Sequence, residues 1–206
     1  MIVTAIEQQK HNKDRFSVFV DGNFVFGLCK ADILYFKIKE NEPIDKEKFD
    51  FIVENLVYIK AQDTAMNFLS FKPRTEREVN IKLKEKEFSD DVINKVITFL
   101  KKYNYINDRK YCEMYISDGM RLKKKGKYLL KFELIQRGID EKIISEVFDE
   151  IEVNEVELAK TLIKKKYNLQ DEITDKEKQK IYGMLARKGY SYSDIKQALY
   201  EVINDE

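Results

Sequence analysis

Basic side chains gather in one short segment of the chain, RLKKKGKYLLK, which spans residues 121 to 131. Its cationic residues are Arg121, Lys123, Lys124, Lys125, Lys127 and Lys131. Several ammonium groups at this spacing can approach a phosphate backbone or an acidic protein surface, and each phosphate that they neutralise releases condensed counterions. A solvated charged loop in a lysine-rich chain explains the same residues. The segment is therefore a candidate contact surface, and both interpretations stay open.

Two further basic residues, Arg74 and Arg77, flank the start of a predicted helix. Thr75 precedes Glu78 by three residues, which is the pattern of a capping box. Charge alone predicts that the two arginines form surface ion pairs with Glu76 or Glu78, and such pairs contribute ~0–1 kcal/mol.

The residues on which most catalytic sites depend are scarce. His11 is the one histidine, and Cys29 and Cys112 lie far apart and outside any CxxC pattern. The seven glycines form neither GxxxxGK[ST] nor GxGxxG, so no phosphate-binding loop is indicated. We therefore predict a protein without enzymatic activity, cofactor or metal. A carboxylate-dependent, metal-assisted nuclease is the enzymatic alternative, and it requires acidic residues clustered in a concave site.

The overall charge of the chain is balanced. Lys and Arg number 38 against 37 Asp and Glu in 206 residues. This balance argues against a protein that coats nucleic acid with its whole surface, and it is compatible with a local basic surface. No apolar run approaches the ~18 residues of a membrane span, and the N-terminus lacks the pattern of a secretory signal. Together with the isolated cysteines, these features predict a cytoplasmic protein with no membrane partner.

The elements that must position these side chains follow an internal repeat. The segments KEKEFSDDVI, IQRGIDEKII and ARKGYSYSDI begin at residues 84, 135 and 186, which are equally spaced. Apolar residues agree in all three copies at helical spacing. Examples are Leu83, Leu134 and Leu185 in the first helix of each copy, and Ile93, Ile144 and Ile195 in the second. These positions indicate a structural scaffold.

The joint between the two helices of each copy has its own chemical signature. One of its positions is occupied by Ser89, Asp140 and Ser191. All three are favoured N-caps, because a side-chain oxygen can accept from the unpaired amides of the next helix. Gly138 and Gly189 stand where the preceding helix is expected to end in the left-handed conformation. Glu87 takes this place in the first copy at a cost of about 1 kcal/mol, so we expect a deviation there.

The N-terminal part of the chain has a strand-like pattern. The stretches IVTAIEQQ, RFSVFV and FVFGL, at residues 2–9, 15–20 and 24–28, are rich in β-branched and aromatic residues. Asp21-Gly22 predicts a tight hairpin turn, because this pair tolerates positive φ. A short helix is expected at residues 30–36. The predicted fold class is mainly α, preceded by a small three-stranded antiparallel segment.

A further helix is predicted upstream of each helix pair, so that the unit is a three-helix module. These upstream helices lie at residues 60–70, 109–121 and 154–167. The resulting division is a β-rich extension with a short helix at 1–44, a linking helix at 45–59, and three-helix repeats at 60–107, 108–153 and 154–206. The linking helix is expected to meet the next helix near Ile59 to Ala61. Stacked modules form elongated, curved bodies that serve as binding surfaces, and we expect a monomer.

Two longer segments carry more specific information. They are FKPRTEREVNIKLKEKEFSDDVINKVITFLKKYNYINDRKYCEMYI at residues 71 to 116 and GKYLLKFELIQRGIDEKII at residues 126 to 144. Both resemble the RecX family of bacterial recombination regulators, and the resemblance extends over about residues 60 to 206. The strand-rich start is similar to the N-terminal extension of longer members. Glu87 and Asn41 stand where glycine is usual in the family, and the third repeat matches more loosely.

The resemblance implies a non-enzymatic regulator of RecA that acts in homologous recombination and DNA repair. Family members bind the RecA filament formed on single-stranded DNA, lie along its groove, and restrain filament growth and strand exchange. The resemblance also extends a contact role to Arg74 and Arg77. The alternative is a helical-repeat DNA-binding protein that acts independently of RecA.

Overall fold

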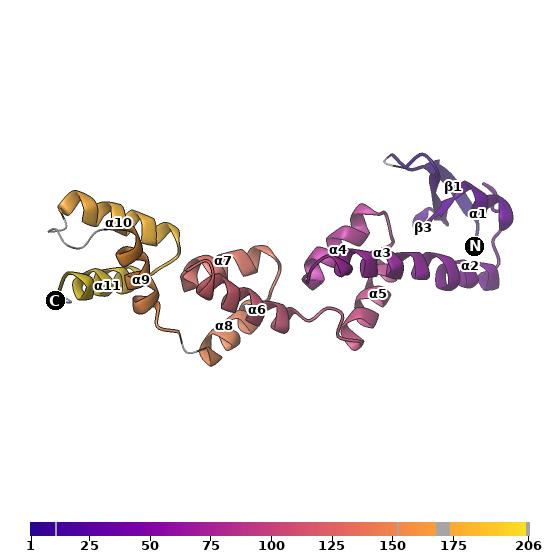
Figure 1. The fold of residues 1–206 in the computed structure, drawn as a ribbon. Coiled ribbons are helices and arrows are strands. Elements are labelled where there is room, and N and C mark those ends of the chain that lie inside the picture. The colour runs from indigo at the N-terminus through magenta and orange to yellow at the C-terminus, as the bar shows by residue number, and fades with distance from the viewer. Residues whose placement is uncertain (11, 152, 168–173, 205–206) are drawn as a thin grey trace. The chain divides into compact units, whose positions relative to one another are not determined.

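A computed structural model describes residues 1–10, 12–151, 153–167 and 174–204 of the chain (Figure 1). His11 lies outside the described residues. The chain divides into two compact units, Met1–Asn107 and Asp108–Glu206. The first unit contains the sheet and the first repeat, and the second unit contains the second and third repeats.

The first unit begins with a three-stranded antiparallel sheet in the order β1-β2-β3. The strands are Val3–Gln8, Arg15–Val20 and Asn23–Cys29. Asp21 and Gly22 join β2 to β3 with φ of 49° and 81°, the positive values that the predicted tight turn requires. The short helix α1, Lys30–Tyr35, follows β3 directly. The predicted three-stranded antiparallel segment and the short helix after it are both confirmed.

A continuous helical segment follows, made of α2 (Lys46–Ile52), η1 (Val53–Val57) and α3 (Tyr58–Ser70). The expected boundary near Ile59 to Ala61 is wrong, because both residues lie inside α3. Residues 46–70 contain neither glycine nor proline, so nothing in the sequence stops the helix. Instead η1 is a π-helical turn, in which the amide of Tyr58 donates to the carbonyl of Val53. This turn shifts the apolar face and produces the change of register that resembles a helix end.

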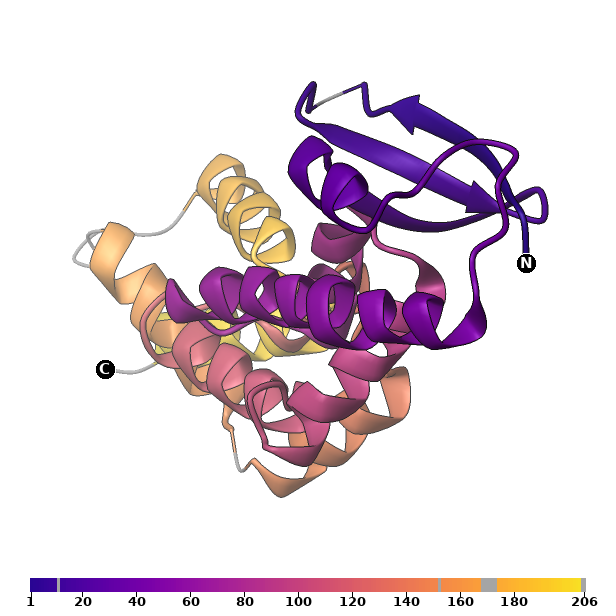
Figure 2. The ribbon, with the colours of Figure 1, turned by 90° about the vertical axis from the view of Figure 1, so that its right-hand side faces the viewer.

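The sheet and the first repeat share one hydrophobic core. Its fully buried members include Phe26 from β3, Ile52 from α2, and Leu83 and Ile93 from the repeat. Figures 1 and 2 show the sheet on one side of the long helical segment, where β3 lies against η1. The sheet is therefore anchored to the first repeat by burial of apolar side chains.

The three repeats have the predicted helices. They are α4 (Glu76–Glu85) and α5 (Asp90–Lys102) after α3; α6 (Asp108–Arg121), α7 (Lys127–Gln136) and α8 (Glu141–Glu150); and α9 (Glu155–Lys166), α10 (Asp175–Arg187) and α11 (Tyr192–Asn204). The repeated leucines and isoleucines are buried in every copy: Leu83, Leu134, Leu185, Ile93, Ile144 and Ile195. The mainly α fold class and the internal repeat are both confirmed.

All three joints have a residue in the left-handed backbone conformation at the same position. Glu87 has φ of 54°, against 83° for Gly138 and 87° for Gly189. The first joint therefore keeps the left-handed backbone, and its expected deviation lies at the cap, where Ser89 makes no side-chain cap bond within the described residues. The Glu87 carboxylate contacts the sheet of the same unit, because the Ser17 hydroxyl of β2 donates to Glu87 Oε2 at 3.4 Å.

The predicted N-caps differ in their side-chain bonds. Asp140 accepts from the Lys142 amide at 2.8 Å, and Ser191 accepts from the Asp194 amide at 3.0 Å. Ser89 occupies the N-cap position of α5, but no backbone amide of the described residues donates to its hydroxyl as a cap. Asp90 and Asp91 in the first turn of α5 supply negative charge next to its N-terminus.

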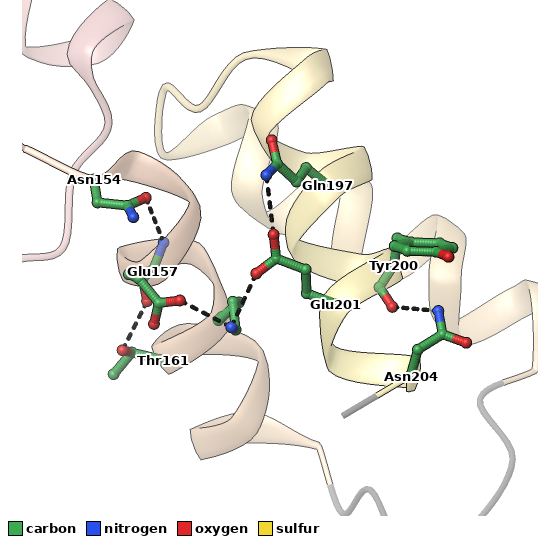
Figure 3. A network of polar contacts seen from close by, with 8 residues as sticks. Asn154, Glu157, Thr161, Gln197, Tyr200, Glu201 and Asn204 are labelled. Atoms are coloured by element: carbon green, nitrogen blue, oxygen red, sulfur yellow. Dashed lines mark hydrogen bonds and ion pairs between the residues drawn. The ribbon is translucent and has the colours of Figure 1, made fainter. Parts of the chain in front are cut away.

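A polar network connects two helices of the third repeat (Figure 3). Lys160 of α9 donates to Glu157 at 2.8 Å and to Glu201 of α11 at 3.0 Å. Gln197 donates to the same Glu201 carboxylate at 2.9 Å. Because the Lys160 side chain is only 13% exposed, this pairing links α9 to α11 with less solvent screening than a surface ion pair.

Within the described residues, no helix is long and apolar enough to cross a membrane. The same part of the chain contains no group of three or more His, Cys, Asp or Glu side chains arranged to hold a metal ion.

Candidate functional site

The basic segment lies at the end of α6, in the following loop and at the start of α7. Arg121 is the last residue of α6, and Lys127 is the first residue of α7. Lys123, Lys124 and Lys125 belong to the loop, and Lys131 lies one turn into α7. The six cations predicted from the sequence fall into two groups, according to whether the side chain has a partner within the unit.

Three of the six cations have partners within the unit. Lys125 donates to Glu133 Oε2 at 2.6 Å, and Lys131 forms an ion pair with Glu141 at 2.9 Å. The Lys127 ammonium lies 4.9 Å from the centroid of the Phe148 ring, within the range of a cation–π contact. These contacts leave the three side chains less available to a ligand.

The Lys125 pair is the best shielded of these contacts. The side chains of Lys125 and Glu133 are 19% and 26% exposed, and the Tyr115 hydroxyl donates to the same carboxylate at 2.8 Å. Burial alone would raise the pKa of Glu133, but the hydrogen bonds from Lys125 and Tyr115 and the nearby positive charge hold it below its ordinary value. Lys125 is thus best explained as a structural residue that anchors the loop to α7.

The other three cations, Arg121, Lys123 and Lys124, form no ion pair with any carboxylate of the described residues. Arg121 and Lys123 are exposed, and Lys124 is half-buried. Lys124 has φ of 51°, a left-handed conformation that is uncommon for a residue with a Cβ. These three residues are the part of the basic segment that remains available to an anionic ligand.

The third repeat fixes the backbone of this loop. The Lys188 ammonium donates to the Lys123 carbonyl at 3.1 Å, and the Tyr190 hydroxyl donates to the Lys124 carbonyl at 3.0 Å. Burial raises the pKa of Tyr190, as does the nearby Glu155, so the hydroxyl stays protonated and remains a donor at neutral pH. Sequence reasoning assigned no role in the loop to Lys188 or Tyr190, because their contact with the loop depends on how the second and third repeats pack.

The third repeat also supplies the missing cap of α7. Helices α4 and α10 begin with a threonine capping box, whereas the N-cap of α7 is Gly126, which has no side chain. The amides of Gly126 and Tyr128 donate to the carbonyls of Lys188 and Gly189, at 2.8 and 3.1 Å. The Lys127 amide donates to the Glu155 carboxylate at 2.7 Å. Acceptors from α9 and the end of α10 thus satisfy amides that a capping side chain satisfies elsewhere.

At this contact, Gly126 and Gly189 leave no room for a side chain. A Cβ on Gly126 would approach the Gly189 backbone to less than 3.0 Å, and a Cβ on Gly189 would approach Leu129 equally closely. The sequence signal for this contact was the absence of a capping box at Gly126, since the equivalent helices of the other two repeats both have one. Gly189 was assigned only to the helix end, although it serves both purposes.

The remaining candidates, Arg74 and Arg77, belong to the first unit. The Arg74 guanidinium lies 4.0 Å from the centroid of the Phe68 ring, and its buried Nε has no hydrogen-bond partner among the described residues. Arg77 is exposed. The neighbouring acids have other partners, since Glu78 completes the Thr75 capping box and Glu76 pairs with Lys101 at 2.8 Å. Arg74 therefore packs against an aromatic ring, whereas Arg77 is accessible to a partner.

Comparison with protein-family models assigns the whole architecture. The N-terminal domain of regulatory protein RecX matches residues 1–45, and the first, second and third RecX three-helix domains match residues 61–100, 107–147 and 154–199. The first of these matches contains the sheet, and the other three correspond to the three repeats.

Individual relatives and solved structures agree with this assignment. Proteins named Regulatory protein RecX from Clostridium perfringens and Clostridium acetobutylicum are 38% and 34% identical to this chain, over 99% and 98% of its length and 97% of their own. The crystal structure of RecX from Lactobacillus salivarius has a TM-score of 0.64 at 31% identity, and covers 70% of this chain and 96% of that one. A second crystal structure of a regulatory protein RecX has a TM-score of 0.63 at 27% identity, over 100% of this chain and 99% of that one. The chain belongs to the RecX family of regulatory proteins.

Proposed function

We propose that this protein binds RecA filaments on single-stranded DNA and inhibits or remodels them without catalysis, as a cytoplasmic monomer. The observation that carries the proposal is the group of exposed or half-buried cations in the α6–α7 loop that lack carboxylate partners in the described chain. Like charges held close together without counterions destabilise a fold slightly, and an anionic partner offsets this repulsion.

The balanced charge of the chain supports a filament over naked duplex as the target. With 38 basic and 37 acidic residues, attraction to any polyanion is weak outside the local surface. The chain's membership of a family of regulatory proteins supports a role that acts through a partner. We propose Arg77 as a separate contact residue of the first unit, since its side chain is exposed there.

Titration of the purified protein into RecA ATPase and strand-exchange assays tests the proposal directly. We expect both activities to change as the protein occupies the filament, and the change to be weaker in a variant in which Arg121, Lys123 and Lys124 are replaced by glutamine. Unchanged activities at several-fold excess over filament sites would exclude this function.

A DNA-binding protein that acts independently of RecA is the second candidate, and the same cations favour it. Its signature is high affinity for DNA without RecA together with no effect on the RecA ATPase. An electrophoretic mobility shift assay run beside the ATPase titration separates the two functions.

A further inference from the structure

Lys188 lies in the third repeat, far from the basic loop in sequence, but its ammonium is part of the same surface. It donates to the Lys123 carbonyl at 3.1 Å. We propose that the second and third repeats together form one phosphate-binding surface for single-stranded DNA, in which Lys188 is a direct contact and Tyr190 is a positioning residue. The proposal rests on the proposed function for its ligand class, and it adds a repeat and two residues to the contact surface.

The charges at this joint favour an anionic ligand. Lys123, Lys124 and Lys188 are brought together by the contacts of the loop with the end of α10, and no carboxylate of the described residues forms an ion pair with any of them. An ammonium group has three N–H donors, and the contact with the Lys123 carbonyl uses one of those of Lys188. Two donors therefore remain for phosphate oxygens.

The loop is held in its binding geometry before any ligand arrives. Tyr190 is 4% exposed, and its hydroxyl donates to the carbonyl of Lys124, the residue with left-handed backbone. The Gly126 amide is fixed by the Lys188 carbonyl at 2.8 Å. A loop ordered in this way loses little conformational entropy on binding, which increases affinity without further contacts.

Exposed aromatic rings next to the cations indicate single-stranded DNA as the nucleic acid. Tyr128 and Phe132 are 66% and 60% exposed and lie one turn apart on α7. The Tyr128 amide donates to the Gly189 carbonyl, so the backbone of Tyr128 lies next to the residue that follows Lys188. Unpaired bases stack on such rings while lysines neutralise the backbone, whereas a duplex keeps its bases stacked inside.

Fluorescence anisotropy of a labelled oligothymidylate, measured without RecA over a range of salt concentrations, tests this site. We expect Lys188→Gln to weaken binding about fivefold at low salt and to reduce the slope of log affinity against log salt by about 0.7, the value for one phosphate on a single strand. Lys188→Arg keeps the charge and should restore most of the affinity. The matched control is Lys196→Gln, an exposed lysine of the same repeat, which should change the affinity less than twofold.

Tyr190→Phe separates positioning from direct contact. We expect about threefold weaker binding with an unchanged salt slope, because no cation is lost. Tyr200→Phe is its control, since Tyr200 is 70% exposed and should have no effect. A purely structural role for Tyr190 would lower the melting temperature and leave the dissociation constant of the folded protein unchanged, which would refute the positioning role.

Two results would overturn the site as a whole. One is equal weakening by Lys188→Gln and Lys196→Gln. The other is the absence of oligothymidylate binding by the wild-type protein, in which case loss of RecA filament binding in Lys188→Gln would assign the surface to an acidic protein face. The protein can change the ATPase activity of a RecA filament without itself binding naked DNA. Failure of this inference is therefore distinguishable from failure of the proposed function.

Discussion

Among single residues, Glu87 combines an uncommon backbone conformation with a contact between two parts of the first unit. Its φ is 54°, and its carboxylate accepts from the Ser17 hydroxyl of β2. Burial lowers the pKa of Arg15 in the same strand, and the negative charge of Glu87 acts in the opposite direction. Glu87 therefore stabilises the docking of the sheet on the repeat, which offsets the strain of its backbone.

Substitutions at Glu87 separate these two effects. Glu87→Ala keeps the strained backbone and loses the carboxylate, so we expect the free energy of unfolding to fall by about 1 kcal/mol. Glu87→Gly loses the same contact but relieves the strain, and its stability should exceed that of the alanine variant by about 1 kcal/mol. Urea unfolding measures both values. Equal stability of the two variants would show that the left-handed conformation costs nothing here.

The two cysteines should differ in reactivity. Burial raises the pKa of Cys112 to about 11, and its side chain is inaccessible, whereas Cys29 is half-exposed. We therefore expect a thiol reagent at pH 8 to modify Cys29 in the native protein and to reach Cys112 only after unfolding. Mass spectrometry of the labelled protein gives the result, and rapid labelling of Cys112 in a Cys29→Ser variant would contradict it.

At the level of elements, the start of α7 depends on a different repeat. Its first amides bond to acceptors from α9 and the end of α10, because Gly126 provides no cap of its own. Burial raises the pKa of Glu155, while the hydrogen bond from Lys127 acts against this rise. The second and third repeats are thus joined by backbone hydrogen bonds in addition to apolar contacts.

Alanine substitutions of two glycines test this joint. Gly126→Ala forces a Cβ against the Gly189 backbone, and we expect a loss of about 2 kcal/mol or more. Gly183→Ala in α10 is the control, because its Cβ would meet only Arg187 Nη1 at 3.4 Å, and it should raise stability by about 0.5–1 kcal/mol. Thermal unfolding measures the stability of both variants. A Gly126→Ala variant as stable as the wild type would contradict the close contact between the repeats.

The anchor between the loop and α7 predicts a dependence on pH. Because the folded protein holds the pKa of Glu133 below its ordinary value of 4.5, the ionised carboxylate contributes stability above that pH. This contribution is lost as pH falls through the lowered pKa. Glu133→Gln should therefore be about 1 kcal/mol less stable than the wild type at pH 7, with a smaller difference once the pH has fallen below the lowered pKa. A difference that does not depend on pH would assign the effect to packing.

The sequence predicted those elements whose signals are local. The left-handed glycines Gly138 and Gly189, the hairpin at Asp21-Gly22 and the buried leucines follow from residue type and spacing, and the structure has all of them. The left-handed conformation of Glu87 does not follow from its residue type. The π-turn of η1 was missed because it changes helical register without a glycine or proline. The roles of Lys188 and Tyr190 were missed because they depend on packing between repeats, which short-range patterns do not encode.

For the whole molecule, function is expected to lie where the copies differ. The buried leucines and isoleucines repeat, and they build the scaffold. The cations that lack carboxylate partners among the described residues occur at the joint of the second and third repeats, and Arg77 is particular to the first. The family match covers all four segments of the chain, so membership of the RecX family of regulatory proteins rests on the chain as a whole.

Site-specific crosslinking shows whether the basic loop contacts RecA filaments. A photoreactive benzoylphenylalanine in place of Leu122, which is 69% exposed beside the cations, should form crosslinks to RecA or to DNA in filaments assembled on single strands. The same group in place of Tyr35, 79% exposed in α1, is the control and should form few. Strong crosslinks from position 122 that disappear when RecA and DNA are omitted are the predicted result. Equal yields from both positions, or none from position 122 while the protein sediments with the filament, would show that the loop does not contact the filament.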